Sequence, residues 1–151
     1  MIENLKALGG DIVITDDYLR TPEFKRLTSD LPAPALALNC VGGRSATDLA
    51  RTLADGGKLV TIGGMSKKPV QIPTSLFIFK NISLHGFWLT KWVQQHSAKE
   101  RDAMLATLAT HVRNGELRLW LERHKFSQFD AAIATATSPL PHRKILLQLD
   151  A

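Results

Sequence analysis

The chain contains 151 residues, of which 44% are hydrophobic and 22% are charged, and its formal net charge is +5. This composition is typical of a globular protein, and the length is sufficient for a domain with a substantial core. A single cysteine excludes an intrachain disulfide, and no apolar run reaches the roughly 18 residues that a membrane span needs. The basic residues are scattered, so we expect a solvated basic surface and no nucleic-acid partner.

The N-terminal segment is expected to alternate between helix and strand. Residues 2–8 have the pattern of a helix that ends at the pair Gly9 and Gly10. Residues 11–15 include four β-branched side chains in a row and predict a short strand. Thr21 and Pro22 suit the N-cap and the first turn of a helix, which we expect to end near residue 27.

Two apolar runs further along the chain each end at a pair of glycines. Residues 35–41 precede Gly42 and Gly43, and residues 57–62 precede Gly63 and Gly64. Residues 44–54 place apolar side chains at helical spacing, so the pattern predicts a strand, a helix and a second, parallel strand. In such sheets ligands bind beyond the carboxyl ends of the strands, where glycine lets a ligand approach the backbone. The sequence therefore predicts a binding edge.

The remaining elements follow from capping and apolar patterns. A polar segment at residues 66–73 precedes a predicted helix at 74–80 and a predicted strand at 82–88. Ser97 and Glu100 form the signature of a capping box, which predicts a helix to about residue 113. Residues 119–125, 127–137 and 143–149 predict a strand, a helix and a strand. We expect the following stripe of the long helix to be buried: Met104, Leu105, Leu108 and Val112.

Strands that alternate with helices predict an α/β fold with a largely parallel sheet. Histidine, cysteine and carboxylate residues do not cluster at the spacing of zinc ligands, so we expect no metal site. His85, in the predicted strand at 82–88, is therefore expected to be a packed or interface residue.

Three segments carry a resemblance to a known family. They are residues 36–43, residues 56–65 and residues 79–89, and their most specific feature is Gly63-Gly64-Met65 followed by Gly86-Phe87-Trp88-Leu89. With these motifs, nearly the whole chain resembles the mitochondrial trans-2-enoyl thioester reductases of the medium-chain dehydrogenase/reductase superfamily.

The resemblance implies a domain organisation. Residues 1–90 would be the second half of an NADPH-binding Rossmann domain, a partial parallel sheet with helices on both faces. Residues 91–151 would be the C-terminal segment that returns to a GroES-like catalytic domain. The family's catalytic tyrosine lies in that domain's N-terminal part, so no catalytic residue is expected within this chain, and the chain alone is expected to bind NADPH very weakly and to be inactive.

The resemblance also implies an activity. Family members reduce the carbon-carbon double bond of trans-2-enoyl thioesters, carried by coenzyme A or by acyl carrier protein, with NADPH in mitochondrial fatty-acid synthesis. The chain would therefore be a C-terminal portion of such an oxidoreductase, and its location would be mitochondrial. A homodimer through the strand between Ile82 and Trp88 is expected.

Residue roles follow where the motifs match. One segment is expected to lie along the nicotinamide half of the cofactor, and it consists of Ile62, Gly63, Gly64 and Met65. The backbone of Phe87, Trp88 and Leu89 is expected to meet the nicotinamide carboxamide. Lys144 matches a C-terminal lysine that contacts the cofactor, and its flexible point charge suits a phosphate.

Two other interpretations stay open at this stage. The chain could be a non-catalytic dimerisation module that pairs with full-length relatives through its edge strand. It could also be part of a related quinone reductase, although Gly86-Phe87-Trp88-Leu89 after Gly63-Gly64-Met65 favours the enoyl reductase branch.

Overall fold

The computed structural model describes residues 2–138 and 143–149, and the chain divides into two compact units. Residues 11–95 form one unit, which we call the sheet unit. Residues 1–10 together with residues 96–151 form the other, which we call the tail unit. No described helix is both long and apolar enough to cross a membrane.

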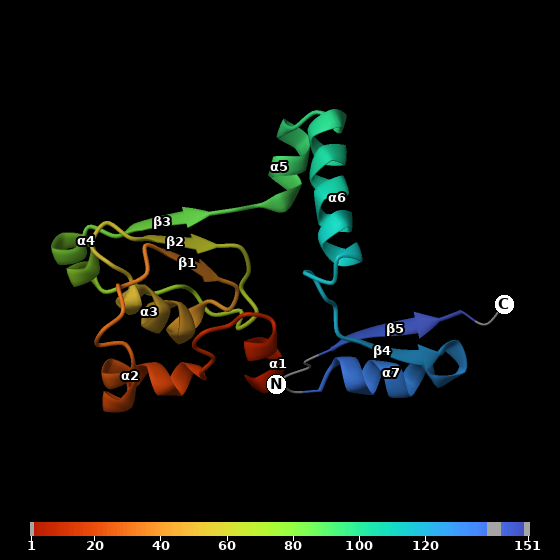
Figure 1. Cartoon of the computed structure of the whole chain (residues 1–151), viewed down its shortest axis with the longest axis horizontal. Coiled ribbons are helices and arrows are strands. Elements are labelled where there is room, and N and C mark those ends of the chain that lie inside the picture. The colour runs from red at the N-terminus through yellow and green to blue at the C-terminus, as the bar shows by residue number, and fades with distance from the viewer. Residues whose placement is uncertain (1, 139–142, 150–151) are drawn as a thin grey trace. The chain divides into compact units, whose positions relative to one another are not determined.

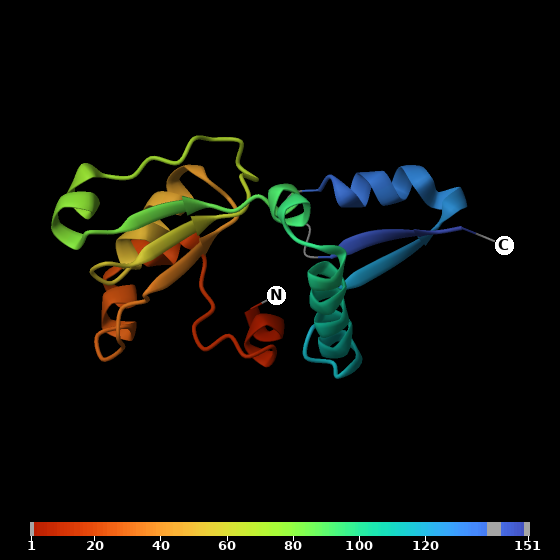
Figure 2. The same ribbon diagram turned by 90° about the horizontal axis from the view of Figure 1, so that it is seen from above.

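The sheet unit is built on three parallel strands in the order β1 (Leu36–Asn39), β2 (Lys58–Thr61) and β3 (Ser83–Gly86). Helix α3 (Gly43–Thr52) connects β1 to β2, and α4 (Thr74–Lys80) precedes β3 (Figure 1). The segment between β2 and α4 runs back along the sheet before α4 begins (Figure 2). This arrangement confirms the predicted α/β fold and its parallel pair of glycine-ended strands.

The core of this unit lies on one face of the sheet. Ala37 and Leu59 are register partners, and both are buried against α3 residues Ala50 and Leu53. Leu36 and Leu38, on the opposite face, are 57% and 58% exposed. Helices were expected on both faces of the sheet, and within the described residues a helix packs on the face of Ala37 and Leu59. Successive right-handed crossovers in one direction place their helices on the same side of a sheet.

The predicted strand at residues 11–15 is not formed. No strand of the described chain pairs with these residues, and an isolated strand has no ladder to satisfy its backbone. Ile12 and Ile14 instead line an apolar pocket with Phe24 of α2 (Pro22–Leu27). A 3-10 helix, η1 (Asp16–Arg20), precedes α2, and the predicted N-cap of α2 is confirmed because Thr21 Oγ1 accepts the Phe24 N–H at 3.2 Å.

Helix α5 (Leu89–Gln95) completes the sheet unit. The tail unit contains the short helix α1 (Ile2–Ala7) and the long helix α6 (Ala98–Arg113). Its strands β4 (Leu121–Lys125) and β5 (Lys144–Gln148) pair in parallel. The 3-10 helix η2 (Phe126–Gln128) and α7 (Phe129–Ala136) follow β4, and α7 packs on both strands (Figure 1).

The predicted capping box of α6 is present. The Glu100 N–H donates to Ser97 Oγ at 3.3 Å, and the Ser97 N–H donates to Glu100 Oε2 at 2.8 Å. The prediction of a buried stripe on α6 is wrong, however, because Leu105 is 57% exposed and Val112 is 51% exposed. Helical spacing groups apolar residues on one face, but burial also needs a neighbouring element to cover that face.

Candidate functional site at the carboxyl edge of the parallel sheet

The three parallel strands end side by side. The N–H of Ile62, directly after β2, donates to the carbonyl oxygen of Asn39 at 2.9 Å. The N–H of Phe87, directly after β3, donates to the carbonyl oxygen of Thr61 at 2.9 Å. The segments that the sequence predicted to line a ligand thus leave the sheet at one edge, and open parallel sheets bind their ligands beyond this edge.

A buried amide organises the edge. The Asn39 side chain is only 2% exposed, and its Nδ2 donates to Thr61 Oγ1 at 3.1 Å. Its Oδ1 accepts the N–H groups of Gly42 at 2.9 Å and Val41 at 3.2 Å. One side chain therefore holds the loop after β1 and the end of β2 together. Asn39 was not predicted as a site residue, and the available signal was a polar residue that closes an apolar strand.

At three of the edge glycines, packing within the chain leaves little room for a side chain. A Cβ at Gly42, whose φ is 82°, would lie 2.9 Å from the carbonyl oxygen of Lys68. A Cβ at Gly43, whose φ is 54°, would lie 3.1 Å from Lys68 Cβ. A Cβ at Gly63 would lie 3.0 Å from the carbonyl oxygen of Cys40. These glycines permit close packing of loops, whereas a Cβ at Gly64 would meet no atom within 4 Å.

Large apolar side chains are exposed along the same segments. Met65 is 80% exposed and Trp88 is 65% exposed, although both belong to residue types that normally pack. The exposed members of this group, which we call the edge residues, are Ile62, Met65, Phe87, Trp88 and Leu89. An exposed apolar surface marks a binding surface more often than a plain solvated one.

Backbone donors accompany these side chains. In the described part of the chain, the N–H groups of Gly63, Gly64 and Trp88 donate no hydrogen bond to a protein acceptor. An exposed apolar surface beside unused backbone donors suits a ligand with a planar ring and a polar substituent.

Lys144 belongs to the tail unit. It is the first residue of β5, and its side chain is exposed. Its N–H donates to the Trp120 carbonyl oxygen at 2.8 Å, and it pairs in register with Leu121. Of the eight predicted binding residues, seven therefore lie at the edge of the sheet unit and Lys144 lies on a separate sheet.

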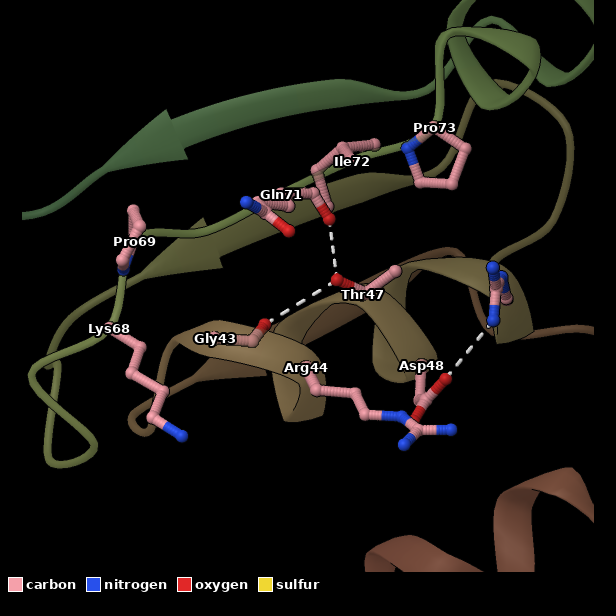
Figure 3. Close-up of a pocket in the computed structure, with 10 residues that line it drawn as sticks. Gly43, Arg44, Thr47, Asp48, Lys68, Pro69, Gln71, Ile72 and Pro73 are labelled. Atoms are coloured by element: carbon pink, nitrogen blue, oxygen red, sulfur yellow. Dashed lines mark hydrogen bonds and ion pairs between the residues drawn. The ribbon is translucent and has the colours of Figure 1, made fainter.

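A hollow lies on the flank of α3, and none of the edge residues lines it. It has a volume of about 690 Å³ and is lined by α3 and by residues 68–73 (Figure 3). Asp48, only 3% exposed, pairs here with Arg51 at 3.2 Å, with Arg20 at 3.5 Å and with Arg44 at 3.8 Å. The contact with Arg20 links η1 to α3, so Asp48 stabilises the helix whose N-terminus lies at the edge.

Two carboxyl groups of the tail unit have lowered pKa values. Hydrogen bonds from Ser97 lower the pKa of Glu100, the backbone bond most strongly, and a hydrogen bond to the His111 side chain lowers the pKa of Glu116. The described residues contain no group of three or more His, Cys, Asp and Glu side chains that could hold a metal ion.

Comparison with known proteins finds sequence similarity to dehydrogenases and enoyl reductases. The sequence pattern of the zinc-binding dehydrogenase family matches residues 2–110. The chain is 53% identical over 118 residues to a mitochondrial enoyl-[acyl-carrier-protein] reductase of Dictyostelium discoideum, and these residues are 78% of this chain and 34% of that protein. The human enzyme of the same name is 50% identical over 115 residues, which are 76% of this chain and 31% of the relative. The chain spans about a third of the length of these relatives.

Solved structures agree with this similarity. The heterodimer of mitochondrial 2-enoyl thioester reductase from Candida tropicalis has a TM-score of 0.74 and 34% sequence identity, and the match covers 89% of this chain and 40% of that chain. A complex of Etr1p with NADP and crotonyl-CoA has a TM-score of 0.76 and 32% identity, with 97% of this chain and 43% of that chain covered. These similarities confirm the resemblance that the glycine and aromatic motifs indicated.

Proposed function

The chain belongs to the zinc-binding dehydrogenase family, and from this premise we propose that it forms the nicotinamide side of the cofactor cleft in an NADPH-dependent 2-enoyl thioester reductase. The observation that carries the proposal is the carboxyl edge of the parallel sheet, where exposed apolar side chains adjoin unused backbone N–H groups. The relatives' names, and a neighbour solved with NADP and crotonyl-CoA, supply the class of ligand.

Each edge segment has a proposed role. Ile62, Gly63, Gly64 and Met65 lie along the nicotinamide ring, where the open space at Gly64 allows close approach to the backbone. Phe87, Trp88 and Leu89 meet the carboxamide, and the unused N–H of Trp88 is a suitable donor to its oxygen. Lys144 contacts a phosphate of the cofactor. Residues 1–90 and 91–151 are proposed to belong to the cofactor-binding and catalytic domains, respectively.

The chemistry follows from this placement. When bound, NADPH supplies a hydride to the β-carbon of the enoyl thioester, and a proton completes the saturated product. The edge residues hold the ring in a fixed orientation and keep water from it, because their apolar side chains surround it. The general acid is proposed to lie in a part of the enzyme that these motifs do not include.

The substrate is proposed to be a trans-2-enoyl thioester of coenzyme A or of an acyl carrier protein, processed in the mitochondrion. This proposal rests on the names of the relatives, which are mitochondrial enoyl-[acyl-carrier-protein] reductases.

A homodimer through β3 is also proposed. In the described residues β3 pairs with β2 alone, so its other edge carries unpaired backbone groups. Such an edge pairs readily with a second copy of the same strand.

Saturation-transfer NMR of the purified chain with millimolar NADPH tests the cofactor role. We expect stronger transfer to the nicotinamide protons than to the adenine protons, and a loss of the nicotinamide signal in Trp88→Ala. Phe79→Ala is the matched control, because Phe79 is a 78% exposed aromatic residue in α4, before the amino end of β3. Absence of any transfer, or equal losses in both variants, would contradict the proposal.

A further inference from the structure

We propose that Gly86 is a steric determinant of this ligand site: its missing side chain leaves the space that the nicotinamide ring occupies. The inference rests on the proposed function and extends it to a residue outside the predicted binding set. It follows from a comparison of the reasons for which each edge glycine is needed.

The backbone at Gly86 does not require glycine. Gly86 is the last residue of β3 and the register partner of Thr61, and its φ lies outside the left-handed region. Any residue can adopt this extended conformation. Glycine in a strand loses more conformational entropy on folding than other residues do and contributes no packing, so its presence calls for a separate reason.

Packing within the chain does not supply that reason. A Cβ at Gly86 would meet no atom within 4 Å, whereas one at Gly42 or Gly63 would meet a carbonyl oxygen at 2.9 Å or 3.0 Å. Glycines that are neither strained nor crowded mark places where a ligand or another backbone approaches closely. Gly64 has the same two properties, and it follows the neighbouring strand at the same edge.

The strand register places the open space at Gly86 beside the hydrogen-bonded side chains of Asn39 and Thr61. Asn39, Thr61 and Gly86 are successive register partners across the three strands, so their Cβ directions share one face of the sheet. Asn39 Nδ2 donates a hydrogen bond to Thr61 Oγ1, and the N–H of Phe87 donates one to the carbonyl oxygen of Thr61. The open space at Gly86 is therefore bordered by the hydrogen-bonded Thr61, and it adjoins Phe87, the first residue of the segment proposed to meet the carboxamide.

A methyl group at Gly86 then has opposite effects on the free and bound protein. In the free protein it fills open space, and alanine reduces the entropy of the unfolded chain, so the melting temperature stays the same or rises. In the complex it overlaps the ring, and overpacking of this kind raises the dissociation constant about tenfold. A glycine retained for folding would show the reverse pattern.

The test compares Gly86→Ala and Gly86→Val with the original chain. Saturation-transfer titrations use two probes, the reduced nicotinamide mononucleotide and adenosine 2',5'-bisphosphate, which represent the two halves of NADPH. We expect both variants to lose the mononucleotide signal progressively with side-chain size and to keep the adenosine signal of the original chain. Ser83→Ala, at the other end of β3, is the matched control and leaves both signals unchanged.

The outcomes separate the inference from the proposed function. Mononucleotide binding that is equal in the original chain and in Gly86→Ala overturns the inference and leaves the proposed function in place. A lowered melting temperature of Gly86→Ala also overturns it, because the space would then be needed by the fold. No mononucleotide binding to the original chain overturns the proposed function itself.

Discussion

Asn39 Nδ2 donates a hydrogen bond of 3.1 Å to Thr61 Oγ1. The two residues are 22 positions apart in the sequence, and each is the last residue of its strand, β1 or β2. The same amide accepts two N–H groups of the loop after β1. A buried polar connection therefore joins the ends of β1 and β2 at the candidate site.

Replacement of this amide tests its structural role. We expect Asn39→Ala to lower the free energy of unfolding by about 1–3 kcal/mol, because two backbone donors and one hydroxyl lose their buried partner. Thr61→Ala removes only the hydrogen bond between the strands, so we expect it to lower the free energy of unfolding by less than Asn39→Ala does. Urea denaturation of both variants measures the difference, and a larger loss in Thr61→Ala would show that the loop contacts contribute little.

Adjacent glycines provide an internally controlled pair. Gly63→Ala places a Cβ 3.0 Å from the Cys40 carbonyl oxygen, so we expect it to lower the free energy of unfolding by about 1–3 kcal/mol. Gly64→Ala enters open space at an ordinary φ and should raise it by about 0.4–1 kcal/mol. Thermal unfolding followed by circular dichroism compares the two, and equal destabilisation would contradict the distinction between crowded and open glycines.

The capping box predicts a pH dependence. Hydrogen bonds from Ser97 lower the pKa of Glu100 below its ordinary 4.5 in the folded chain. The folded state therefore binds this proton less readily than the unfolded state does. The stabilisation is complete above pH 4.5 and is lost as the pH falls through the lowered pKa.

Ser97→Ala measures the side-chain part of this contribution, because alanine keeps the backbone N–H that donates to Glu100 Oε2. The variant should melt at a lower temperature than the original chain at pH 7, and the gap should narrow at pH 3. Helix unfolding followed by circular dichroism at both pH values provides the readout. Lys99→Ala, a substitution in the same helical turn outside the box, should leave the gap near zero at both pH values. A difference in melting temperature for Ser97→Ala that stays constant with pH would show that the side-chain bond between Ser97 and Glu100 does not contribute to the pH dependence.

The dimer proposal is tested at the outer edge of β3. The N–H groups of Ser83 and Phe87 donate inward to β2, so strand alternation directs the N–H of Leu84 outward. Leu84→Pro removes that outward donor, and an edge strand tolerates proline there. Sedimentation should show a dimer for the original chain and a monomer for Leu84→Pro with an unchanged circular dichroism spectrum.

His85→Pro is the contrasting variant. Its N–H lies on the inward side of the strand by the same alternation, so it should disrupt the sheet itself. A monomeric original chain, or a Leu84→Pro variant that stays dimeric, would contradict pairing through β3.

Much of the fold follows from local patterns. The alternation of strands and helices, the Thr21 cap and the Ser97 capping box are all found where the sequence predicts them. Local patterns failed where a partner from elsewhere in the chain decides the outcome. Within residues 2–138 and 143–149, no strand pairs with residues 11–15, and the apolar residues Leu105 and Val112 of α6 are exposed.

The sequence by itself determined the family, the parallel strands and the edge at which they end, because these depend on motifs and periodicities within short segments. Only the tertiary structure decided which glycine serves which purpose. Gly42 and Gly63 are crowded by Lys68 and Cys40, whereas Gly64 and Gly86 face open space. Steric crowding depends on atoms brought together by folding, so identical glycines in identical motifs acquire different roles.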